Sequence, residues 1–476
     1  MELNLRNNNI MRNIKLDYRD LIIFLIPFII FTIYLYVFNP GIMSYDSFNQ
    51  LHQIATSNFK NNHPFFHTFI EMLCINVYGS PASYCVFQIT VFSVMWTAIC
   101  NYFRENKKQF VLQIIVTLII CLIPLNALYS ITLWKDVLFS YFLMFTCFLV
   151  KVLVDKDEIG YPFIILISAV MACTAQLRHN GTILILVFLI VLSIYLYKRN
   201  KSNRAYITIP ALTIVFILLI ASLNVAYDVD DNQKDALFAK VAHMLADYDL
   251  NLDLSDEDSA KIHKLIGKKD IEKYYDVTFS DPIYGHSNRS VYQNNKMEYL
   301  GIALKYSISH PGHFMKYLLK SSPMVWDITR DNDWKGLIYK TDNDNAKELF
   351  YKQKNTSASK GFDNATVQNS GKSYYNYLNS SVCNFRDNPV LQTLFISPAL
   401  YMYLSILLTV GIYFITKSKS IFLVYLPNII NIGLIFLSTP VQDVRYLYPN
   451  FLICYLLIII LISIKTFKNS KLNKYY

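Results

Sequence analysis

The chain has 476 residues, of which 54% are hydrophobic, 15% aromatic and only 16% charged, and its formal net charge is +10. This composition is typical of a polytopic membrane protein. The positive charge lies in short segments between apolar stretches, with no basic and aromatic surface of the kind that binds nucleic acid, so nucleic acid is excluded as a partner.

The apolar stretches predict an all-α polytopic membrane protein with about ten transmembrane helices. A hydrocarbon core roughly 30 Å thick needs about 20 apolar residues per helix. The first span follows a basic N-terminus without a small-residue cleavage site, which favours a retained anchor over a signal peptide. The expected spans are residues 21–37, 81–103, 110–128, 137–154, 161–177, 181–197, 206–227, 391–416, 420–438 and 447–465.

The distribution of basic residues predicts the orientation of these spans. Lys and Arg gather before the first span, in three loops and in the C-terminal tail. Threading the spans puts all of these segments on one side, which the positive-inside rule makes cytoplasmic. We therefore expect a cell-membrane protein with both ends inside (N-in/C-in). The residues are Arg6, Arg12, Lys15, Arg19, Arg104, Lys107, Lys108, Lys198, Arg199, Lys201, Arg204, Lys417, Lys419, Lys465, Lys468, Lys471 and Lys474.

Two polar regions are expected outside, and they divide the chain. Residues 1–227 form an N-terminal membrane domain whose first outer loop is 39–80. Within that loop, residues 64–78 are apolar but too short to cross, and a crossing there would move every later basic loop outside, so we expect a helix lying on the membrane. Residues 228–390 form an extracytoplasmic domain, and residues 391–476 form the last helices and the basic cytoplasmic tail.

The domain at 228–390 is expected to be mostly helical, either α or α+β. Residues 253–273 predict one surface helix behind a polar cap of Ser255, Asp256 and Glu257. Residues 297–319 predict two helices, broken at 310–312, that pack down on the membrane domain. Residues 341–373 are rich in Asn, Asp, Lys, Ser and Gly, and a mobile loop is expected there.

Unusual polar clusters all fall on the expected outer side. Ionisable groups near hydrocarbon cost several kcal/mol unless they are paired or hydrated. A chain that gathers them at one face is therefore expected to have a functional site there. The clusters are Ser44–Ser47, Asn61–Pro64, Trp134–Asp136, Arg178–Asn180 and Gln442–Tyr446.

Asp46 and Arg445 are the strongest individual candidates. Asp46, a few residues after the first span, can act as a general base if a low local dielectric raises its pKa; it could instead ligate a divalent metal, or cap a helix that starts at Ser47. Arg445, at the start of the last span, is suited to hold a lipid-linked phosphate. Its alternatives are a pair with Asp443 and a snorkelling side chain.

The other clusters supply candidates for substrate and phosphate binding. Lys135 and Asp136 are read as an anion or hydroxyl contact, against interfacial anchoring by Trp134 with a local Lys–Asp pair. His63 and His67 could share a helical face as metal ligands, although no third ligand is evident. We assign no metal and no cofactor. The full candidate set beyond Asp46 is Arg445, Arg178, Lys135, Asp136, His63, His179, Asn180, Gln50 and Tyr446.

These motifs resemble those of a known superfamily. The first outer loop with Asp46 and a membrane-parallel helix, and residues 443–446 before the final span, resemble the GT-C integral-membrane glycosyltransferases. Four motifs resemble more closely an uncharacterised bacterial multi-pass family related to GT-C, and residues 228–390 match mainly through His310-Pro311 and Trp326. The four are Asp46-Ser47-x-x-Gln50, His63-Pro64, Trp134-Lys135-Asp136 and Arg178-His179-Asn180.

The resemblance implies inverting transfer of a sugar from a polyprenyl-phosphate carrier to an acceptor outside the cytoplasm, such as a cell-wall polymer, a polysaccharide or a protein. It implies that Asp46 is the base and that Arg445 holds the donor phosphate. Many relatives have a paired acid in the first loop, whereas Tyr45 precedes Asp46 here and Phe48 follows Ser47. A metal-independent base is therefore expected.

Two other classes of function remain open from the sequence. A transporter or flippase for a lipid-linked sugar or polymer predicts charges near mid-membrane and broken helices in paired halves. The expected spans contain few charges and no half-to-half symmetry, which favours the enzyme. A non-enzymatic scaffold for wall assembly predicts that changing the outer clusters has little effect on surface glycans.

Overall fold

The computed structural model describes residues 17–156, 158–199, 204–230, 236–328, 372–438, 440 and 442–472. Within these ranges the regular structure is helical, joined by a few isolated β-bridges. The predicted all-α fold class is confirmed. The described part of the region 228–390 is helical as well, without a strand, so the α option holds there.

Eight helical segments are long and apolar enough to cross a membrane, and the bent pair α5 (Lys107–Leu122) and α6 (Pro124–Ser130) makes up to a ninth. Ten spans were expected; α8 (Tyr161–Leu177), with 17 residues, is a shorter apolar helix that packs against its neighbours. The inside–outside orientation stays a prediction. The eight are α1 (Tyr18–Val37), α4 (Ala82–Phe103), α7 (Lys135–Asp155), α9 (His179–Lys198), α10 (Ala205–Ala226), α22 (Pro398–Thr416), α23 (Ser420–Leu437) and Val444–Ile464, which joins η3 (Val444–Leu447) to α24 (Tyr448–Leu472).

Two expected spans are wrong in their extent, both because of proline. The span expected at 110–128 is bent by 74° between α5 and α6, where Ile123 is extended and Pro124 opens the next helix. The span expected to begin at 391 begins at Pro398 instead, after a separate helix α21 (Pro389–Ile396). The residue before a proline avoids the α conformation, so each X-Pro step interrupts the helix.

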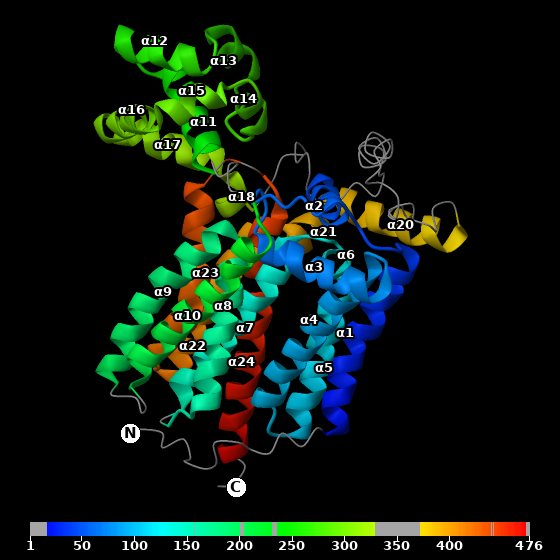
Figure 1. The fold of residues 1–476 in the computed structure, drawn as a ribbon. Helices are drawn as coiled ribbons and strands as arrows, with labels where there is room; N and C mark the ends of the chain where they lie inside the picture. Colours follow the sequence, from blue (N-terminus) through cyan, green and yellow to red (C-terminus); the bar gives the residue numbers. More distant parts are fainter. Residues whose placement is uncertain are drawn as a thin grey trace.

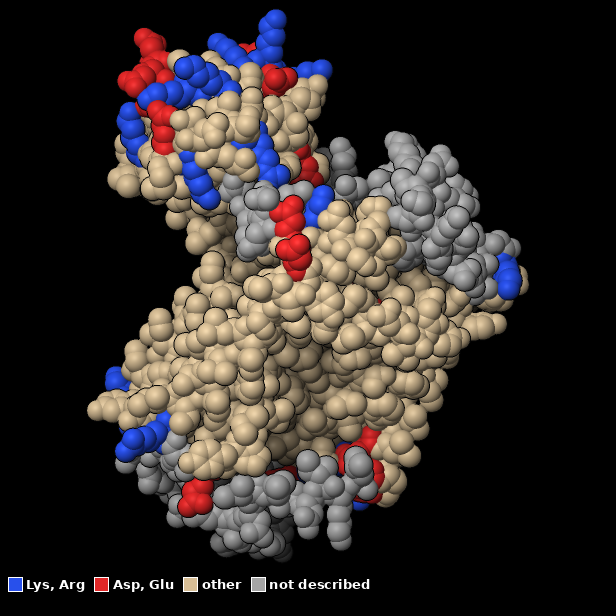
Figure 2. All heavy atoms as spheres, in the orientation of Figure 1, with Lys and Arg blue, Asp and Glu red and all other residues tan. Residues whose placement is uncertain are grey.

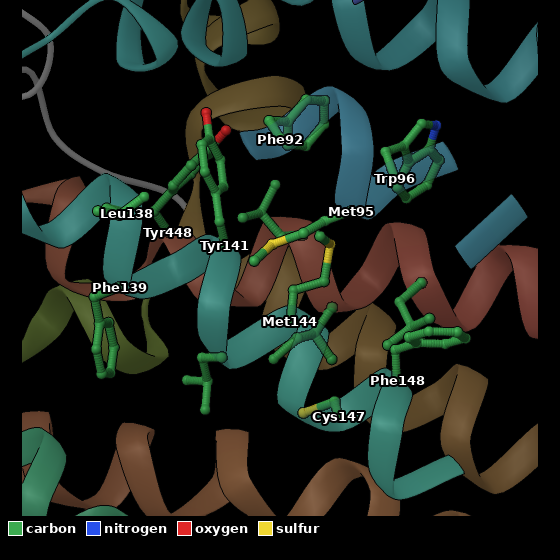
Figure 3. Close-up of a cluster of buried hydrophobic side chains, with 14 of the residues drawn as sticks. Phe92, Met95, Trp96, Leu138, Phe139, Tyr141, Met144, Cys147, Phe148 and Tyr448 are labelled. Carbon is green, nitrogen blue, oxygen red and sulfur yellow. The ribbon is translucent and has the colours of Figure 1, made fainter. Parts of the chain in front are cut away.

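The centre of the bundle consists of α7 and the last span. In Figure 1 these two lie between α1, α4 and α5 on one side and α8 to α10, α22 and α23 on the other. Most of each is buried inside the protein, 78% of the span of α7 and 72% of the last span. Figure 3 shows the packing where α4, α7 and α24 meet, with Phe92, Trp96, Tyr141 and Tyr448 among the large side chains. Such packing contacts, not the hydrophobic effect, hold helices together inside a membrane.

Short helices cover the end of the bundle nearest the region 228–390 (Figure 1). They are α2 (Tyr45–Thr56), α3 (Phe65–Tyr78), α20 (Ser373–Asp387) and α21. A helix is confirmed at 64–78 as α3, which packs against α4 and buries Phe65 among aromatic rings of Phe59 and Tyr227, while its position on the membrane stays a prediction. The C-terminal end of α3 is not covered by other parts of the described structure, since Val77 is 87% exposed.

The residues 236–326 form a helical insertion with its own apolar core, beyond the end of the bundle (Figure 1). The helix expected at 253–273 is wrong as one element, because it is split at Gly267, although Ser255 caps it as expected. The break expected at 310–312 is confirmed, and the domain boundaries stay predictions. The helices are α11 (Ala236–Asn251), α12 (Asp256–Leu265), α13 (Lys268–Tyr274), α14 (Asp281–Gly285), α15 (Arg289–Asn294), α16 (Lys296–Ser309), α17 (Pro311–Ser321) and α18 (Pro323–Trp326).

The last helices of the insertion pack on the bundle. Helices α17 and α18 contact α23, and α18 also contacts α22. The mobile loop expected at 341–373 lies outside the described residues, apart from its last two positions. In Figure 2 the insertion surface carries intermixed acidic and basic side chains, whereas the flank of the bundle is almost free of them between its two ends. An uncharged belt of this kind suits contact with lipid.

The opposite end of the bundle is fastened by a buried ion pair. Asp20, at the start of α1, is 2% exposed and pairs with Arg104, which follows α4. Asn101 donates a hydrogen bond to each oxygen of the same carboxylate at 2.9 Å. These contacts join α1 to α4 away from the insertion.

We expect Asp20→Ala to lower the free energy of unfolding by about 3–5 kcal/mol, because it leaves Arg104 buried without its charged partner. The control is Asp155→Ala, which removes an exposed pair with Lys151 and is expected to cost about 0.5 kcal/mol. Thermal melting of both variants in detergent measures the difference. Equal melting temperatures would contradict a structural role for the Asp20 pair.

Candidate functional site

The polar clusters that the sequence places on one side meet in a single group of charges. The group, here called the charge cluster, lies where the first outer loop, the start of α7, the start of α9 and η3 come together. Asp46 and Arg445 are 399 positions apart in the chain and form a direct hydrogen bond. The charge cluster consists of Asp46, His63, Lys135, Asp136, Arg178, Asp443 and Arg445.

The first outer loop is held against the segment before α7 by backbone pairing. Ile42 accepts from Leu133 N at 3.0 Å and donates to Ile131 O at 2.8 Å. The preceding Gly41 has φ +119°, and a Cβ there would lie 2.6 Å from Cys85 Sγ, so only glycine fits. This tight turn sets where the following residues enter α2.

Asp46 lies in the first turn of α2 and is not its cap. The helix begins at Tyr45, and Ser44 is the N-cap with a capping box through Ser47. The alternative that Asp46 caps a helix starting at Ser47 is therefore wrong. Ser47 Oγ also donates to Leu133 O at 2.7 Å, which turns the first turn of α2 toward α7.

Asp46 has three basic neighbours from three separate segments. Its Oδ2 accepts from Arg445 Nη1 at 2.8 Å and lies 3.9 Å from Lys135 Nζ. Its Oδ1 lies 3.9 Å from His63 Nε2. Lys135 Nζ is in turn 3.0 Å from His63 Nδ1, so a neutral His63 accepts from the ammonium group.

A second layer of ion pairs lies deeper. Arg445 Nε is 2.7 Å from Asp443 Oδ2 and 3.8 Å from Asp136 Oδ2. Asp136 has no exposed surface and pairs with Arg178 Nε at 3.1 Å. Buried charges need such partners to offset the cost of desolvation. Asp136 and Arg178 therefore form the buried floor of the cluster, and Arg178 is only 6% exposed.

Aromatic rings enclose the two guanidinium groups. The Arg445 guanidinium lies 4.7 Å from the Trp134 ring centre, and that of Arg178 lies 5.0 Å from the ring of Tyr446. The Tyr446 hydroxyl also accepts from Arg445 Nη2 at 3.2 Å. Trp134 Nε1 donates to Ser44 Oγ at 2.7 Å, which connects the Trp134 ring to the start of α2.

The charges around Asp46 reverse the expected direction of its pKa. Burial alone would raise the pKa of the carboxyl, but the charges of Arg445 and Lys135 outweigh it and hold that pKa well below its ordinary value. Burial, followed by the charge of Lys135, lowers the pKa of His63 to about 3. In this arrangement Asp46 is ionised and His63 is neutral at physiological pH.

The remaining candidates lie beside the charge cluster. Gln50 is buried and donates to Thr68 Oγ1 at 2.8 Å and to His67 Nδ1 at 2.9 Å, while His67 Nε2 pairs with Tyr84 OH at 2.7 Å. His179 is exposed and lies 3.4 Å from Asn62 O. Asn180 is half-buried in the first turn of α9.

These contacts bear on the metal alternative. Both ring nitrogens of His67 are engaged in hydrogen bonds inside the protein, and His63 precedes α3, so the two do not present a shared pair of ligands. Among the described residues no group of three or more His, Cys, Asp or Glu side chains could hold a metal ion. The charge cluster itself alternates acids with bases, which is a poor donor set for a cation.

Gln442, which the sequence only singles out as part of a motif, joins the charge cluster to the insertion. Its Nε2 donates to Ser321 O at 2.9 Å and to Thr278 O at 3.3 Å, and its Oε1 accepts from Met324 N at 3.1 Å. The next residue is Asp443 of the cluster. Only the tertiary fold could have shown this link, because its partners are backbone groups of a distant segment.

Comparison with protein-family models, curated proteins and solved structures finds no match. The helices and their apolar composition define the class, and the chain is a multi-pass helical membrane protein.

The buried His63 gives a testable pH dependence. The unfolded chain protonates His63 near its ordinary pKa of about 6.5, whereas the folded chain does so only near 3. The stability linked to neutral His63 is therefore present above about pH 6.5 and is lost as pH falls toward 3. We expect His63→Gln to reduce the fall in melting temperature between about pH 7 and 4.5.

The control for this measurement is His310→Gln, which removes an exposed imidazole in the insertion. Its pH dependence is expected to follow that of the unchanged protein. A wild-type slope in the His63→Gln variant would contradict the burial of a neutral His63.

Proposed function

We propose that the protein is a membrane glycosyltransferase of the GT-C type, which transfers a sugar from a polyprenyl-phosphate donor to an acceptor at the extracytoplasmic face of a bacterial cell membrane. The observation that carries the proposal is the direct pair between Asp46 and Arg445 at one end of the bundle. The two residues are the base and the phosphate ligand that the family resemblance implies. Their contact supports a single site that contains both roles.

Donor binding is argued from the balance of charge. The cluster contains three acidic and three basic side chains beside a neutral His63, so an added phosphate must take the place of one carboxylate. Asp46 is the most accessible of the acids, 24% exposed against 18% for Asp443 and none for Asp136. The phosphate therefore displaces Asp46 from Arg445, whose guanidinium can hold phosphate oxygens bidentately.

Displacement prepares Asp46 for catalysis. Once Arg445 is bound to phosphate, the strongest attraction on the carboxylate is gone and its pKa rises toward the ordinary range. The acceptor hydroxyl gives its proton to Asp46 while its oxygen bonds to the anomeric carbon. The bond from that carbon to the phosphate oxygen breaks, and the electron pair leaves on the polyprenyl phosphate held by Arg445. The configuration at the anomeric carbon is inverted.

The transporter alternative has one observation in its favour. The bent pair α5 and α6 is the kind of interrupted helix that transporters use to form a substrate site. The polar side chain of Asn126 in α6 is, however, bonded inside the protein to Tyr448 OH at 3.0 Å and Tyr455 OH at 3.3 Å. The charge cluster lies at one end of the spans, which favours an enzyme. Net movement of a lipid-linked sugar without bond cleavage would favour the transporter.

The decisive variant is Asp46→Asn. We expect it to bind polyprenyl phosphate about tenfold or more tightly, because Arg445 loses a competing carboxylate and the cluster gains a net positive charge. We expect its turnover to fall by about 10²–10⁴, the usual contribution of a general base. Binding of polyprenyl phosphate and transfer from labelled polyprenyl-phosphate sugars measure the two effects separately.

Two further variants control this test. Arg445→Gln is expected to weaken polyprenyl-phosphate binding, whereas Asp253→Asn, an exposed change in the insertion, is expected to alter neither quantity. Normal turnover by a folded Asp46→Asn protein would overturn the base assignment. Surface glycans of a deletion strain, compared with a strain carrying Asp46→Ala, test the function in the cell, and unchanged glycans in both would overturn the glycosyltransferase proposal.

A further inference from the structure

One carboxylate of the insertion, that of Asp281, lies near the charge cluster. Asp281 opens α14, and the segment before it runs beside the chain that connects α23 to η3. Ser280 N donates to Pro440 O at 3.1 Å, and Thr278 O accepts from Gln442 Nε2 at 3.3 Å. Pro440 and Gln442 lie just before Asp443 in the chain, so these two bonds place the start of α14 next to the cluster.

Asp281 differs from the acids of the cluster because its carboxylate is unpaired. Its side chain is exposed, and it has no ion pair or hydrogen bond with any residue in the described ranges. It is nevertheless close enough to interact electrostatically with Asp46 and Arg445. Partial desolvation and then the negative charge of Asp46 raise the pKa of Asp281, against the opposing charge of Arg445.

The surroundings of Asp281 suit a sugar or polyol. Two residues close to Asp281 in the chain expose aromatic surface, since Phe279 is 41% exposed and Tyr284 is 38% exposed. Apolar ring faces pack against the C–H faces of sugars, and an ionised carboxylate accepts strong hydrogen bonds from hydroxyl groups. An acid in the first turn also complements a helix dipole, but α14 has only five residues, so this effect is small.

We propose that Asp281 binds a hydroxyl group of the acceptor, a sugar or polyol, and so presents it to Asp46 across the site. The inference rests on the proposed function and adds that the acceptor is held between the insertion and the bundle. Asp281 exchanges no proton in the transfer: it accepts a hydrogen bond from a non-reacting hydroxyl, while Asp46 takes the proton of the attacking one.

The test uses the full chain in detergent, with polyprenyl phosphate carrying a labelled hexose or pentose as the donor. Cell envelopes from the deletion strain are titrated as the acceptor. Asp281→Asn is expected to raise the amount of envelope needed for half-maximal transfer about 10- to 100-fold, the loss expected for one charged hydrogen bond. Its affinity for polyprenyl phosphate is expected to stay within about twofold of the unchanged protein, and Asp281→Glu is expected to recover part of the loss.

The control is Asp253→Asn, the same substitution at an exposed position of the same insertion. If Asp281→Asn matches this control, the acceptor role is overturned while the glycosyltransferase proposal stands. A loss of donor affinity, or a fall in maximal rate with an unchanged acceptor requirement, would also overturn it, since each assigns Asp281 another role. Absence of transfer by the unchanged protein with every donor would overturn both proposals.

Discussion

The requirement that charges at the end of an apolar bundle neutralise one another governs this site. Arg445 meets it by contacting three carboxylates, those of Asp46, Asp443 and Asp136, at 2.8, 2.7 and 3.8 Å. The three carboxylates come from separate segments: Asp46 from α2, Asp136 from α7 and Asp443 from the residue before η3. Because a buried charge deprived of its partner costs several kcal/mol, these contacts fix the loop 39–80, the start of α7 and η3 relative to one another.

The same requirement makes the members of the cluster unequal. Asp136 and Arg178 are buried with fixed partners, so replacing either contact by a ligand would leave a charge uncompensated in the interior. Asp46 is partly exposed and has basic groups on several sides. Because the charges of the cluster balance, an anion can bind at Arg445 only by replacing the accessible carboxylate of Asp46. Anion binding at Arg445 is therefore connected to the contacts and the pKa of Asp46.

Sequence reasoning reached the spans and the members of the cluster for different reasons. Span length and position follow from the apolar runs, and the grouping of the polar motifs follows from threading those spans through a membrane. The bend at Pro124 and the start at Pro398 were missed because apolarity continues through both sites. The direction of the Asp46 pKa was also missed, because the sequence put Arg445 and Lys135 on the same side as Asp46 but could not show that both lie next to its carboxylate. Asp281 gave no signal at all, because nothing local separates it from the other acids of the insertion.

The insertion is coupled to the charge cluster through consecutive residues. The Gln442 amide holds three backbone groups of the insertion, Asp443 pairs with the Arg445 side chain and accepts from its N–H at 3.1 Å, and Arg445 reaches Asp46. A shift of the insertion would therefore move Gln442, and through the few residues that follow it, the guanidinium of Arg445. Under the proposed reaction, the acceptor bound by the insertion and the donor phosphate bound at Arg445 would both contact groups that are held by residues 442–445. This shared segment gives a physical route by which binding of one substrate can alter the affinity for the other.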